Sequence, residues 1–287
     1  MMMIVMILIV MILMMMIVIV SSNEDDRSSD HEHTLVSAVR VCYEKSAEKR
    51  TDNRTVINTK YSHRPGDSLV MLEDAVDDID LAQMITLSDC IKTVDPSRFE
   101  DRKFNNNGYK NKYGGGHDVI FLTGLMPLII PSLTDHLITV AANAAEKAGW
   151  RPSVYHLGIR CIEKLVYHPG GELLYHVDGG STYTLVIHVS NKNDYTGGDF
   201  QIINKGGEVV SRNASKRGGI LFDSNKDHGV TPIITGSRVV YAVEFWPFYD
   251  TNIDDKRPRE VDYADRVKIP QLLEVEVENN QKSCSAK

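Results

Sequence analysis

Short apolar runs separated by turn residues fill the chain between residues 158 and 246. Several of the runs alternate apolar and polar positions, which is the pattern of strands that bury one face. Glycine pairs and a Pro-Gly-Gly triplet separate the runs, and these residues favour chain reversal. The pattern predicts about eight strands of an antiparallel sandwich or jelly roll. They lie near Gly158–Tyr167, Leu173–Val177, Thr182–Ser190, Asp199–Ile203, Glu208–Val210, Gly219–Phe222, Gly229–Ile234 and Arg238–Trp246.

The clearest helix pattern precedes these strands. Apolar residues recur with helical spacing from Pro131-Ser132 to about Lys147, and Gly149 provides a stop signal. A short β-rich run at Asp118–Leu122 comes before this helix. Because a helix with one apolar face must bury it, we expect the helix to cover one side of the sheet.

The chain before residue 116 has no uniform secondary-structure pattern. Polar and acidic residues over Ser21–Asp30 are typical of a stalk. Leu35–Arg50 and Leu69–Met84 allow helices, and Phe104–Gly116 reads as a loop rich in Asn, Lys and Gly. The sequence therefore predicts a mostly β chain in three parts after residue 20. These are a stalk and mixed or helical region over 21–115, a jelly-roll domain with supporting α-helices over 116–250, and a charged tail over 251–287.

The first twenty residues are Met, Ile, Val and Leu only. A helix of that length spans about 30 Å of hydrocarbon, so residues 1–20 predict a transmembrane anchor or a signal segment. The anchor is favoured because the run is long and no basic residue precedes it, although Val20-Ser21-Ser22 suits cleavage. Both an anchor and a signal segment would direct the protein into the secretory pathway. We expect the chain after residue 20 to lie on the lumenal side of the endoplasmic reticulum or Golgi. Sequons at Asn53 and Asn213 agree with that side.

Charge and cysteine content narrow the class of protein further. The chain has 32 basic and 39 acidic residues and a net charge of −7. This balance gives no support to a general nucleic-acid binder, which would need a basic face. Four cysteines are too few for a disulfide scaffold, and no Cys-x-x-Cys pair indicates structural zinc. In an oxidising compartment some of them can pair, and the sequence leaves open which of Cys42, Cys90, Cys161 and Cys284 do so.

Three residues have the types and positions of metal ligands. His176 and Asp178 stand two apart at the end of a predicted strand, so their side chains point to the same face. His228 begins a later strand of the same domain. Two His and one carboxylate on one face of a metal leave the opposite positions open, as in the facial triad of non-heme Fe(II) oxygenases. Zinc fits less well, because catalytic zinc usually takes three His, or two His and one Glu.

An arginine follows the second histidine after a turn. Thr235-Gly236-Ser237 reverses the chain, so Arg238 begins the adjacent antiparallel strand. Its inward neighbours by alternation are Val240 and Ala242, which are small enough to leave a cavity. A fixed guanidinium binds a carboxylate in bidentate fashion. The metal triad and Arg238 together describe a site for an organic acid that also chelates the metal.

The stretch from about Cys161 to Trp246 resembles the 2-oxoglutarate- and Fe(II)-dependent dioxygenases, and within them the prolyl 4-hydroxylase-like group. The resemblance covers less than a third of the chain, and residues 31–150 match only by position. The matching residues are Tyr167-x-x-Gly170, His176-x-Asp178, Tyr195-x-Gly197-Gly198-x-Phe200, Gly219-x-Leu221-Phe222, His228-x-Val230-x-Pro232, Gly236-x-Arg238 and Trp246.

This resemblance implies a double-stranded β-helix and a set of roles. His176, Asp178 and His228 would hold Fe(II), and Arg238 would bind the distal carboxylate of 2-oxoglutarate. Many procollagen and plant members have lysine at that last position, which weakens the assignment to the subgroup. Tyr167 and His188 are expected to line the cosubstrate pocket, although Tyr167 equally suits a buried strand aromatic.

The resemblance also implies the reaction. Iron would bind 2-oxoglutarate and O₂, the keto acid would be decarboxylated to succinate and CO₂, and ascorbate would rescue over-oxidised iron. The substrate expected first is a protein or peptide hydroxylated at prolyl residues. The sequence leaves open the same chemistry on a small molecule or a lysyl residue, and a metal-binding jelly-roll module without turnover.

Overall fold

The computed structural model describes residues 34–47, 59–102, 114–150 and 157–246. The predicted membrane segment 1–20, the stalk and the tail 251–287 lie outside these residues. None of the helices in the described part is both long and apolar enough to span a bilayer.

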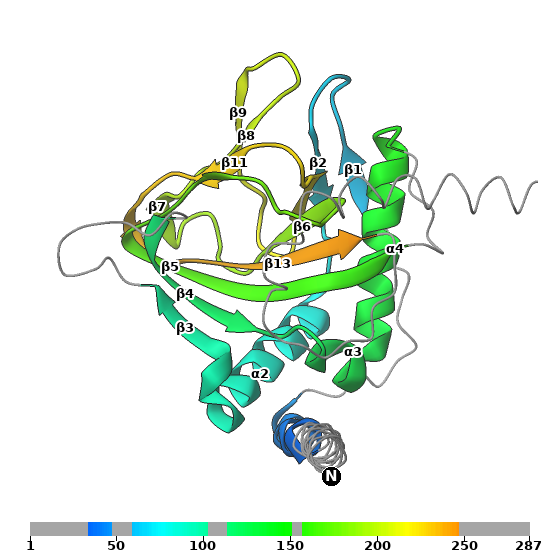
Figure 1. The fold of residues 1–287 in the computed structure, drawn as a ribbon, viewed down its shortest axis with the longest axis vertical. Helices are drawn as coiled ribbons and strands as arrows, with labels where there is room; N and C mark the ends of the chain where they lie inside the picture. Colours follow the sequence, from blue (N-terminus) through cyan, green and yellow to red (C-terminus); the bar gives the residue numbers. More distant parts are fainter. Residues whose placement is uncertain (1–33, 48–58, 103–113, 151–156, 247–287) are drawn as a thin grey trace, which may run out of the picture.

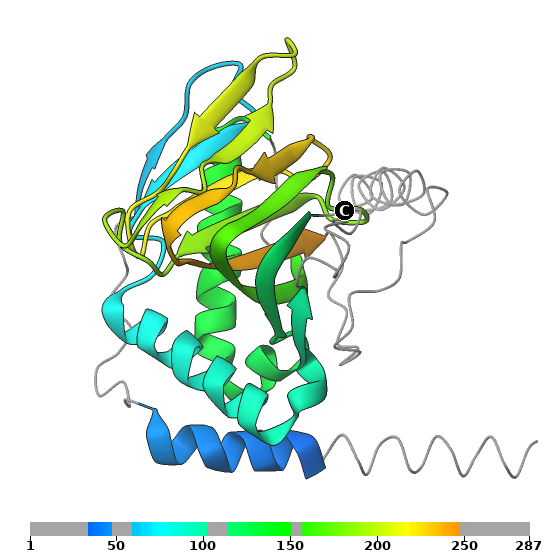
Figure 2. The same ribbon diagram turned by 90° about the vertical axis from the view of Figure 1, so that its left-hand side faces the viewer.

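The structure is a curled antiparallel sheet with a few helices packed against it (Figures 1 and 2). Within the described residues, eleven strands form one sheet in the order β1-β2-β10-β6-β13-β5-β11-β8-β9, with β4 and then β3 attached to β5, while β12 pairs with β7. The strands are β1 Lys60–Ser62, β2 Leu69–Glu73, β3 Phe99–Arg102, β4 Gly114–Phe121, β5 Gly158–His176, β6 Tyr183–His188, β7 Tyr195–Gly197, β8 Phe200–Ile203, β9 Val209–Arg212, β10 Gly219–Asp223, β11 His228–Val230, β12 Ile233–Gly236 and β13 Arg238–Trp246. The mostly β prediction is therefore confirmed, and so are the strands predicted between residues 182 and 246 with one exception. The strand predicted over Gly229–Ile234 is split into β11 and β12, which belong to different sheets, and β7 was not predicted.

The long strand β5 corrects one prediction and positions the site. Gly158–Tyr167 and Leu173–Val177 were expected as two strands separated by a turn, whereas β5 runs through both. Its first half pairs with β13 and β4, and its end pairs with β11. Gly170 has φ +82°, and a Cβ on Gly171 would lie 2.2 Å from the carbonyl oxygen of Gly116. The glycines therefore bend the strand and let β4 approach closely instead of ending it.

A second correction concerns Leu69–Met84, which was expected to be one helix. Leu69–Glu73 is strand β2, paired with β1 and β10, and helix α2 (Asp78–Val94) begins after Asp77. The Asp77 carboxylate accepts a hydrogen bond from the Asp80 amide at 2.7 Å and so caps the helix. Both faces of β2 are covered, Leu69 by one apolar cluster and Val70 by the other, so its apolar run has no alternation. Periodicity alone does not distinguish such a strand from a buried helix.

Of the remaining helices, one packs against the sheet, whereas the helix nearest the N-terminus lies beyond α2, away from the strands (Figure 2). Helix α4 (Pro131–Lys147) confirms the helix predicted there, and its Leu133, Leu137 and Ala141 side chains belong to the larger core cluster. A short helix α3 (Leu125–Ile129) precedes α4, and the 3-10 turn η1 (Pro96–Arg98) follows α2. The helix predicted over Leu35–Arg50 is present over residues 34–46, and its last residues lie outside the described part.

The sheet begins earlier in the chain than the expected domain start at residue 116. Strands β1, β2 and β3 come from the region taken as mixed or helical, and they are hydrogen-bonded into the same sheet. Gly114–Gly116, expected at the end of a loop, are the first residues of β4. The rest of that predicted loop lies outside the described residues.

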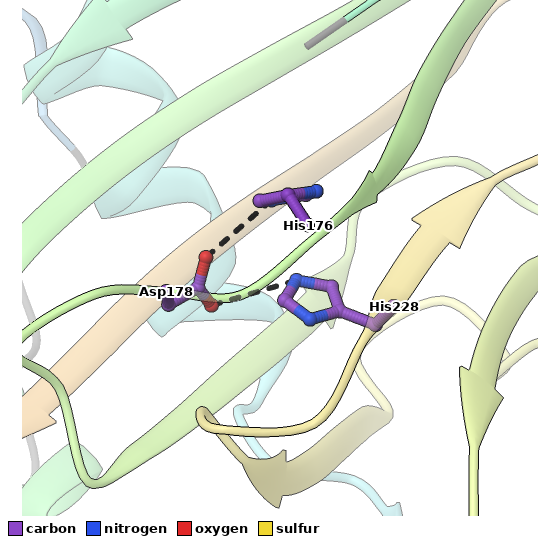
Figure 3. A group of neighbouring side chains, drawn as sticks. All are labelled: His176, Asp178 and His228. Atoms are coloured by element: carbon purple, nitrogen blue, oxygen red, sulfur yellow. Dashed lines mark ion pairs between the residues drawn. The ribbon is translucent and has the colours of Figure 1, made fainter.

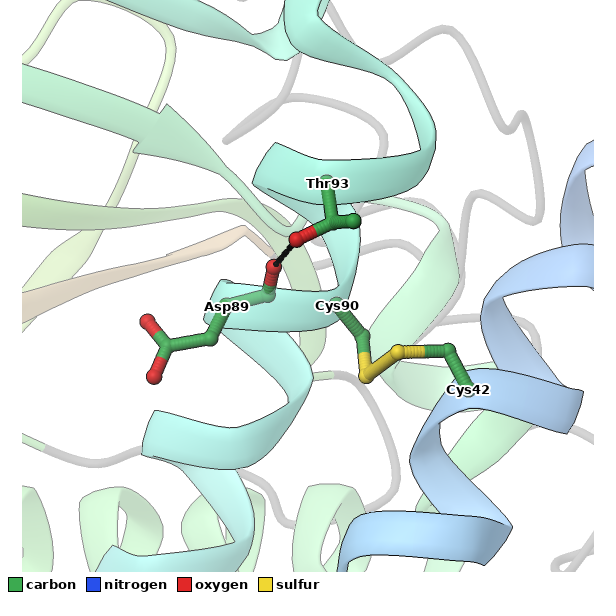
Figure 4. The surroundings of a disulfide bond; sticks show 4 residues. All are labelled: Cys42, Asp89, Cys90 and Thr93. Carbon is green, nitrogen blue, oxygen red and sulfur yellow. Dashed lines mark hydrogen bonds between the residues drawn. A yellow bond between two sulfur atoms is a disulfide. The ribbon is translucent and has the colours of Figure 1, made fainter.

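One disulfide ties the outermost helix to the body. Cys42 on the helix of residues 34–46 is bonded to Cys90 on α2 (Figure 4). Cys161 is buried and forms no disulfide among the described residues, and Cys284 lies outside them. The structure thereby selects one pairing that the sequence left open.

Replacing both Cys42 and Cys90 with serine is expected to lower the free energy of unfolding by about 2–4 kcal/mol, because the bond closes a loop of 48 residues in the unfolded chain. Urea unfolding with and without reductant measures the loss. Reductant should destabilise the natural chain by the same amount and leave the double variant unchanged. Equal stability of the two oxidised proteins would contradict the expectation.

Candidate metal centre

Three side chains from two strand ends converge in the curled sheet (Figure 3). His176 ends β5, Asp178 follows two residues later, and His228 begins β11, where it pairs directly with His176. Asp178 Oδ1 lies 3.5 Å from His176 Nε2, and Asp178 Oδ2 lies 3.5 Å from His228 Nε2. One ligand atom from each of the three residues falls within 4.8 Å of the others. The residues predicted as a triad are thus brought to one point.

Backbone carbonyls fix the orientation of both imidazoles. His176 Nδ1 lies 2.8 Å from the Leu174 oxygen, and His228 Nδ1 lies 2.9 Å from the Lys226 oxygen. Because a carbonyl oxygen only accepts, Nδ1 carries the proton in each ring, and the lone pair is on Nε2 facing Asp178. Burial lowers the pKa of His228, which favours the neutral ring. Two nitrogen lone pairs and a carboxylate that converge in this way form a donor set for a divalent cation.

The carboxylate of Asp178 is itself held by a hydroxyl. Thr184 Oγ1 on β6 donates to Asp178 Oδ2 at 2.6 Å and lies 2.8 Å from Ser224 Oγ. The Asp178 amide donates to the Ser224 carbonyl at 3.0 Å. Thr184 is therefore a positioning residue that the sequence did not identify. Its only sequence signal was its place near the start of a strand that follows the ligand pair.

Replacing Thr184 with valine is expected to weaken Fe(II) binding by about 10- to 100-fold, because it removes the hydroxyl that orients Asp178 and keeps the shape of the side chain. Anaerobic competition with a chromophoric chelator measures the dissociation constant. Thr196→Val, which removes an exposed hydroxyl bonded to Thr235, is the matched control and should leave the constant unchanged. Equal affinities for the two variants would assign Thr184 a purely structural role.

Arg238 lies in the same pocket as a buried cation. Its side chain is 1% exposed, and none of its three guanidinium nitrogens has a hydrogen-bond partner among the described residues. Tyr167 pairs with it across β5 and β13, and the guanidinium carbon lies 5.3 Å from the centre of the Tyr167 ring. A buried guanidinium without partners is costly unless an anion accompanies it. The observation fits a carboxylate ligand at this position.

His188 and Tyr167 surround this arginine in different ways. Tyr167 lines the pocket, and burial raises the pKa of its phenol to about 12. His188 is fully buried opposite Val240, and it is not part of the pocket wall. Burial and the Arg238 charge lower the pKa of His188 well below its usual value, so the ring is neutral. Neither ring nitrogen has a hydrogen-bond partner among the described residues, so His188 also has capacity for a ligand or a water.

The pocket contains charged residues that the sequence analysis missed. Arg102, His117, Tyr167 and Arg238 stand directly opposite one another across β3, β4, β5 and β13, and all of them line the pocket. Burial and the charge of Arg102 lower the pKa of His117 to about 4. Two acids of the inward faces, Glu163 on β5 and Glu244 on β13, also line it. Their signal was an even spacing along the strand, four residues from Tyr167 for Glu163 and six from Arg238 for Glu244. Alternation does not tell whether that face of a strand lines a core or a cavity.

Comparison with solved structures gives the fold a name. A 2OG-Fe(II) oxygenase family oxidoreductase from Burkholderia pseudomallei matches 64% of this chain and 88% of its own, with 15% identity and a TM-score of 0.51. The chain has the fold of the 2OG-Fe(II) oxygenases. The resemblance seen in the sequence is thereby confirmed at the level of the fold, which by itself does not give a reaction.

Two further solved structures match with lower scores. The α-ketoglutarate-dependent epimerase SnoN from nogalamycin biosynthesis covers 66% of this chain and 84% of its own at 12% identity, with a TM-score of 0.48. A prolyl-4-hydroxylase from Pseudomonas putida covers 62% and 91% at 11% identity, with a TM-score of 0.45. No protein-family model and no curated sequence matches this chain.

Proposed function

We propose that this protein is an Fe(II)- and 2-oxoglutarate-dependent oxygenase that hydroxylates a protein or peptide. One observation carries the proposal, namely that the His-Asp-His donor set and an arginine without partners line one pocket of a 2OG-Fe(II) oxygenase fold. A metal-binding site alone would not need the buried guanidinium. A cosubstrate that chelates the metal and extends a second carboxylate to Arg238 accounts for both.

The chain's own residues would bind, orient and shield the reactants. His176, Asp178 and His228 would hold Fe(II) through two Nε2 atoms and one carboxylate oxygen, and Arg238 would bind the distal carboxylate of 2-oxoglutarate. Tyr167 covers the arginine from one side, and the apolar walls Leu165, Val186, Phe222 and Val240 keep water from the bound groups. With 2-oxoglutarate and O₂, iron supplies oxidative decarboxylation to succinate and CO₂ together with hydroxylation of a substrate C–H bond. Ascorbate as a reductant belongs to this proposal through the family resemblance alone.

The substrate and the compartment complete the proposal. A prolyl residue is the substrate group that the motif resemblance suggests. The lumenal side of the secretory route is proposed from the apolar residues 1–20, and the Cys42–Cys90 disulfide supports an oxidising compartment.

Anaerobic spectroscopy tests the function on the full chain. Addition of Fe(II) and then 2-oxoglutarate is expected to give a weak visible charge-transfer band, and admission of O₂ with a peptide substrate should release succinate. A flat spectrum from well-folded protein would contradict the proposal. Tight metal binding without any decarboxylation of 2-oxoglutarate would instead favour the alternative of a metal-binding module without turnover.

A further inference from the structure

Two oppositely charged side chains are buried beside the proposed metal centre and take no part in the proposed reaction. Arg160 on β5 is 4% exposed, and Glu244 on β13 is 2% exposed. Glu244 Oε2 accepts hydrogen bonds from Arg160 Nη1 at 2.9 Å and from Ser181 Oγ at 2.6 Å. Arg160 Nη1 also donates to Ser181 Oγ at 3.1 Å. The three side chains therefore form a closed triangle of hydrogen bonds at the pocket wall, which Glu244 lines.

A β-bulge places Arg160 in this triangle. Glu244 is opposite Cys161 across the β5–β13 pair. The next residue, Phe245, is opposite Ile159, so Arg160 is an extra residue of β5. In a regular strand Arg160 and Cys161 would point to opposite faces, whereas a bulge re-aims a side chain, and bulges are common next to active sites. The bulge thereby lets the guanidinium reach Glu244.

The triangle is connected to the turn that carries the metal ligand Asp178. This turn is Asp178-Gly179-Gly180-Ser181, and the Ser181 amide donates to the Asp178 carbonyl at 3.2 Å. Two adjacent glycines leave the backbone many conformations, and Gly180 has φ +80°. Because the turn does not fix its own geometry, the Ser181 hydroxyl on Glu244 is its anchor to the sheet.

A second connection runs from the same place in the sheet to the same ligand. Thr184 is directly opposite Glu244 across β6 and β13, and its hydroxyl donates to Asp178 Oδ2. Thr184 thus holds the carboxylate of Asp178, and Ser181 holds the backbone of its turn.

A buried ion pair is an inefficient way to stabilise a fold. The desolvation of both ions offsets most of their attraction, and apolar side chains of similar volume often replace such a pair without loss of stability. Hydrogen bonds to a charged group have a defined direction, which apolar contacts lack. The Arg160–Glu244 pair therefore suits the task of holding another group in place.

We propose that Arg160, Glu244 and Ser181 are positioning residues of the metal centre, which fix the turn 178–181 so that the Asp178 carboxylate faces both histidines. The inference rests on the proposed function for the metal centre itself. Arg160 orients Glu244, and Glu244 holds Ser181. When the turn is released, Asp178 loses its orientation toward the other two ligands, and metal affinity falls.

Ser181→Ala removes a single oxygen and tests the connection on the full chain. The dissociation constant of Fe(II), measured by anaerobic competition with a chelator, should rise about 10-fold. The absorption spectrum of bound Co(II), which depends on ligand geometry, should change at saturating metal. Ser88→Ala is the matched control, because Ser88 is also buried and its hydroxyl lies 2.7 Å from Tyr241 Oη on β13. The control should lose thermal stability but keep the affinity and the spectrum of the natural chain.

Arg160→Met combined with Glu244→Leu tests the ion pair and leaves the net charge unchanged. The double variant should unfold at the same or a higher temperature than the natural chain. Its dissociation constant for Fe(II) should nevertheless rise about 10- to 100-fold. Adding Ser181→Ala to the double variant should have no further effect on affinity, because the hydroxyl has already lost its partner.

Three results would overturn the inference: natural metal affinity in Ser181→Ala, a double variant that loses stability but keeps its affinity, or additive effects of Ser181→Ala and the double variant. If the double variant fails to fold, Ser181→Ala decides alone. Asp178→Ala separates the two proposals. Loss of metal binding in Asp178→Ala with natural affinity in Ser181→Ala rejects the positioning role alone, whereas natural affinity in Asp178→Ala rejects the metal centre and with it the proposed function.

Discussion

Replacing Asp178 with alanine is expected to abolish Fe(II) binding at micromolar metal and to stop succinate release. The carboxylate is the anionic member of the donor set, and each of its oxygens faces one histidine Nε2 at 3.5 Å. Without it, the two imidazoles supply neutral donors only, and the charge of a divalent ion in a nearly buried site is left without compensation. The loss of affinity should exceed the ~100-fold typical of residues that merely orient a ligand.

Anaerobic metal titration and the charge-transfer band measure this effect. Asp227→Asn, an exposed acid next to His228, is the matched control and should keep the affinity of the natural chain. Circular dichroism checks that the Asp178 variant is folded. Retention of the band in a folded Asp178→Ala protein would show that the metal binds at another site. The assignment of the metal centre to His176, Asp178 and His228 would then be wrong.

Replacing Arg238 with methionine is expected to raise the dissociation constant of 2-oxoglutarate by about 10²- to 10³-fold while Fe(II) binding stays intact. Loss of one partner from a buried, hydrogen-bonded charge pair typically costs about 3–5 kcal/mol. Arg238 is 1% exposed and its guanidinium has no hydrogen-bond partner in the described residues, so the bound carboxylate would be its principal partner. Arg238→Lys should recover part of the affinity, because a point charge remains but the bidentate fork is lost.

The same substitution has an opposite expected effect on stability. In the absence of ligand, Arg238→Met removes a buried charge that lacks a partner, so the free energy of unfolding of ligand-free protein should rise. Adding 2-oxoglutarate with metal should stabilise the natural chain but not the variant. Unchanged affinity for 2-oxoglutarate in Arg238→Met, or a fall in ligand-free stability, would contradict a cosubstrate role for the arginine.

Sequence patterns predicted the structure correctly where it depends on residues within a single strand, helix or turn. The amphipathic run predicted α4 because its spacing needs only one continuous apolar face. His176 and Asp178 were placed on one side because their spacing by two reflects the pleat of a strand. Arg238 was put at the start of the next strand because Thr235-Gly236-Ser237 is a local turn signal, and β13 begins there.

Predictions failed where a neighbour distant in the sequence decides the structure. Leu69–Glu73 became a strand because β1 and β10 cover its two edges, and Pro169-Gly170-Gly171 stayed within β5 because β4 lies close to it. The ion pairs of the pocket could not be predicted either. Glu244 on β13 pairs with Arg160 on the neighbouring strand β5, 84 residues earlier, and no sequence spacing identifies that partner.

The sequence by itself determined the residue types that can do chemistry here, the strands that carry them and the side of each strand on which they stand, because these follow from the bonding and sterics of adjacent residues. Only the tertiary structure decided that His228 lies against His176, that Cys42 pairs with Cys90, and that the guanidinium of Arg238 is buried without a hydrogen-bond partner among the described residues. Burial and charge compensation are sums over contacts between distant segments, so they become defined only when the sheet has curled and closed around the pocket.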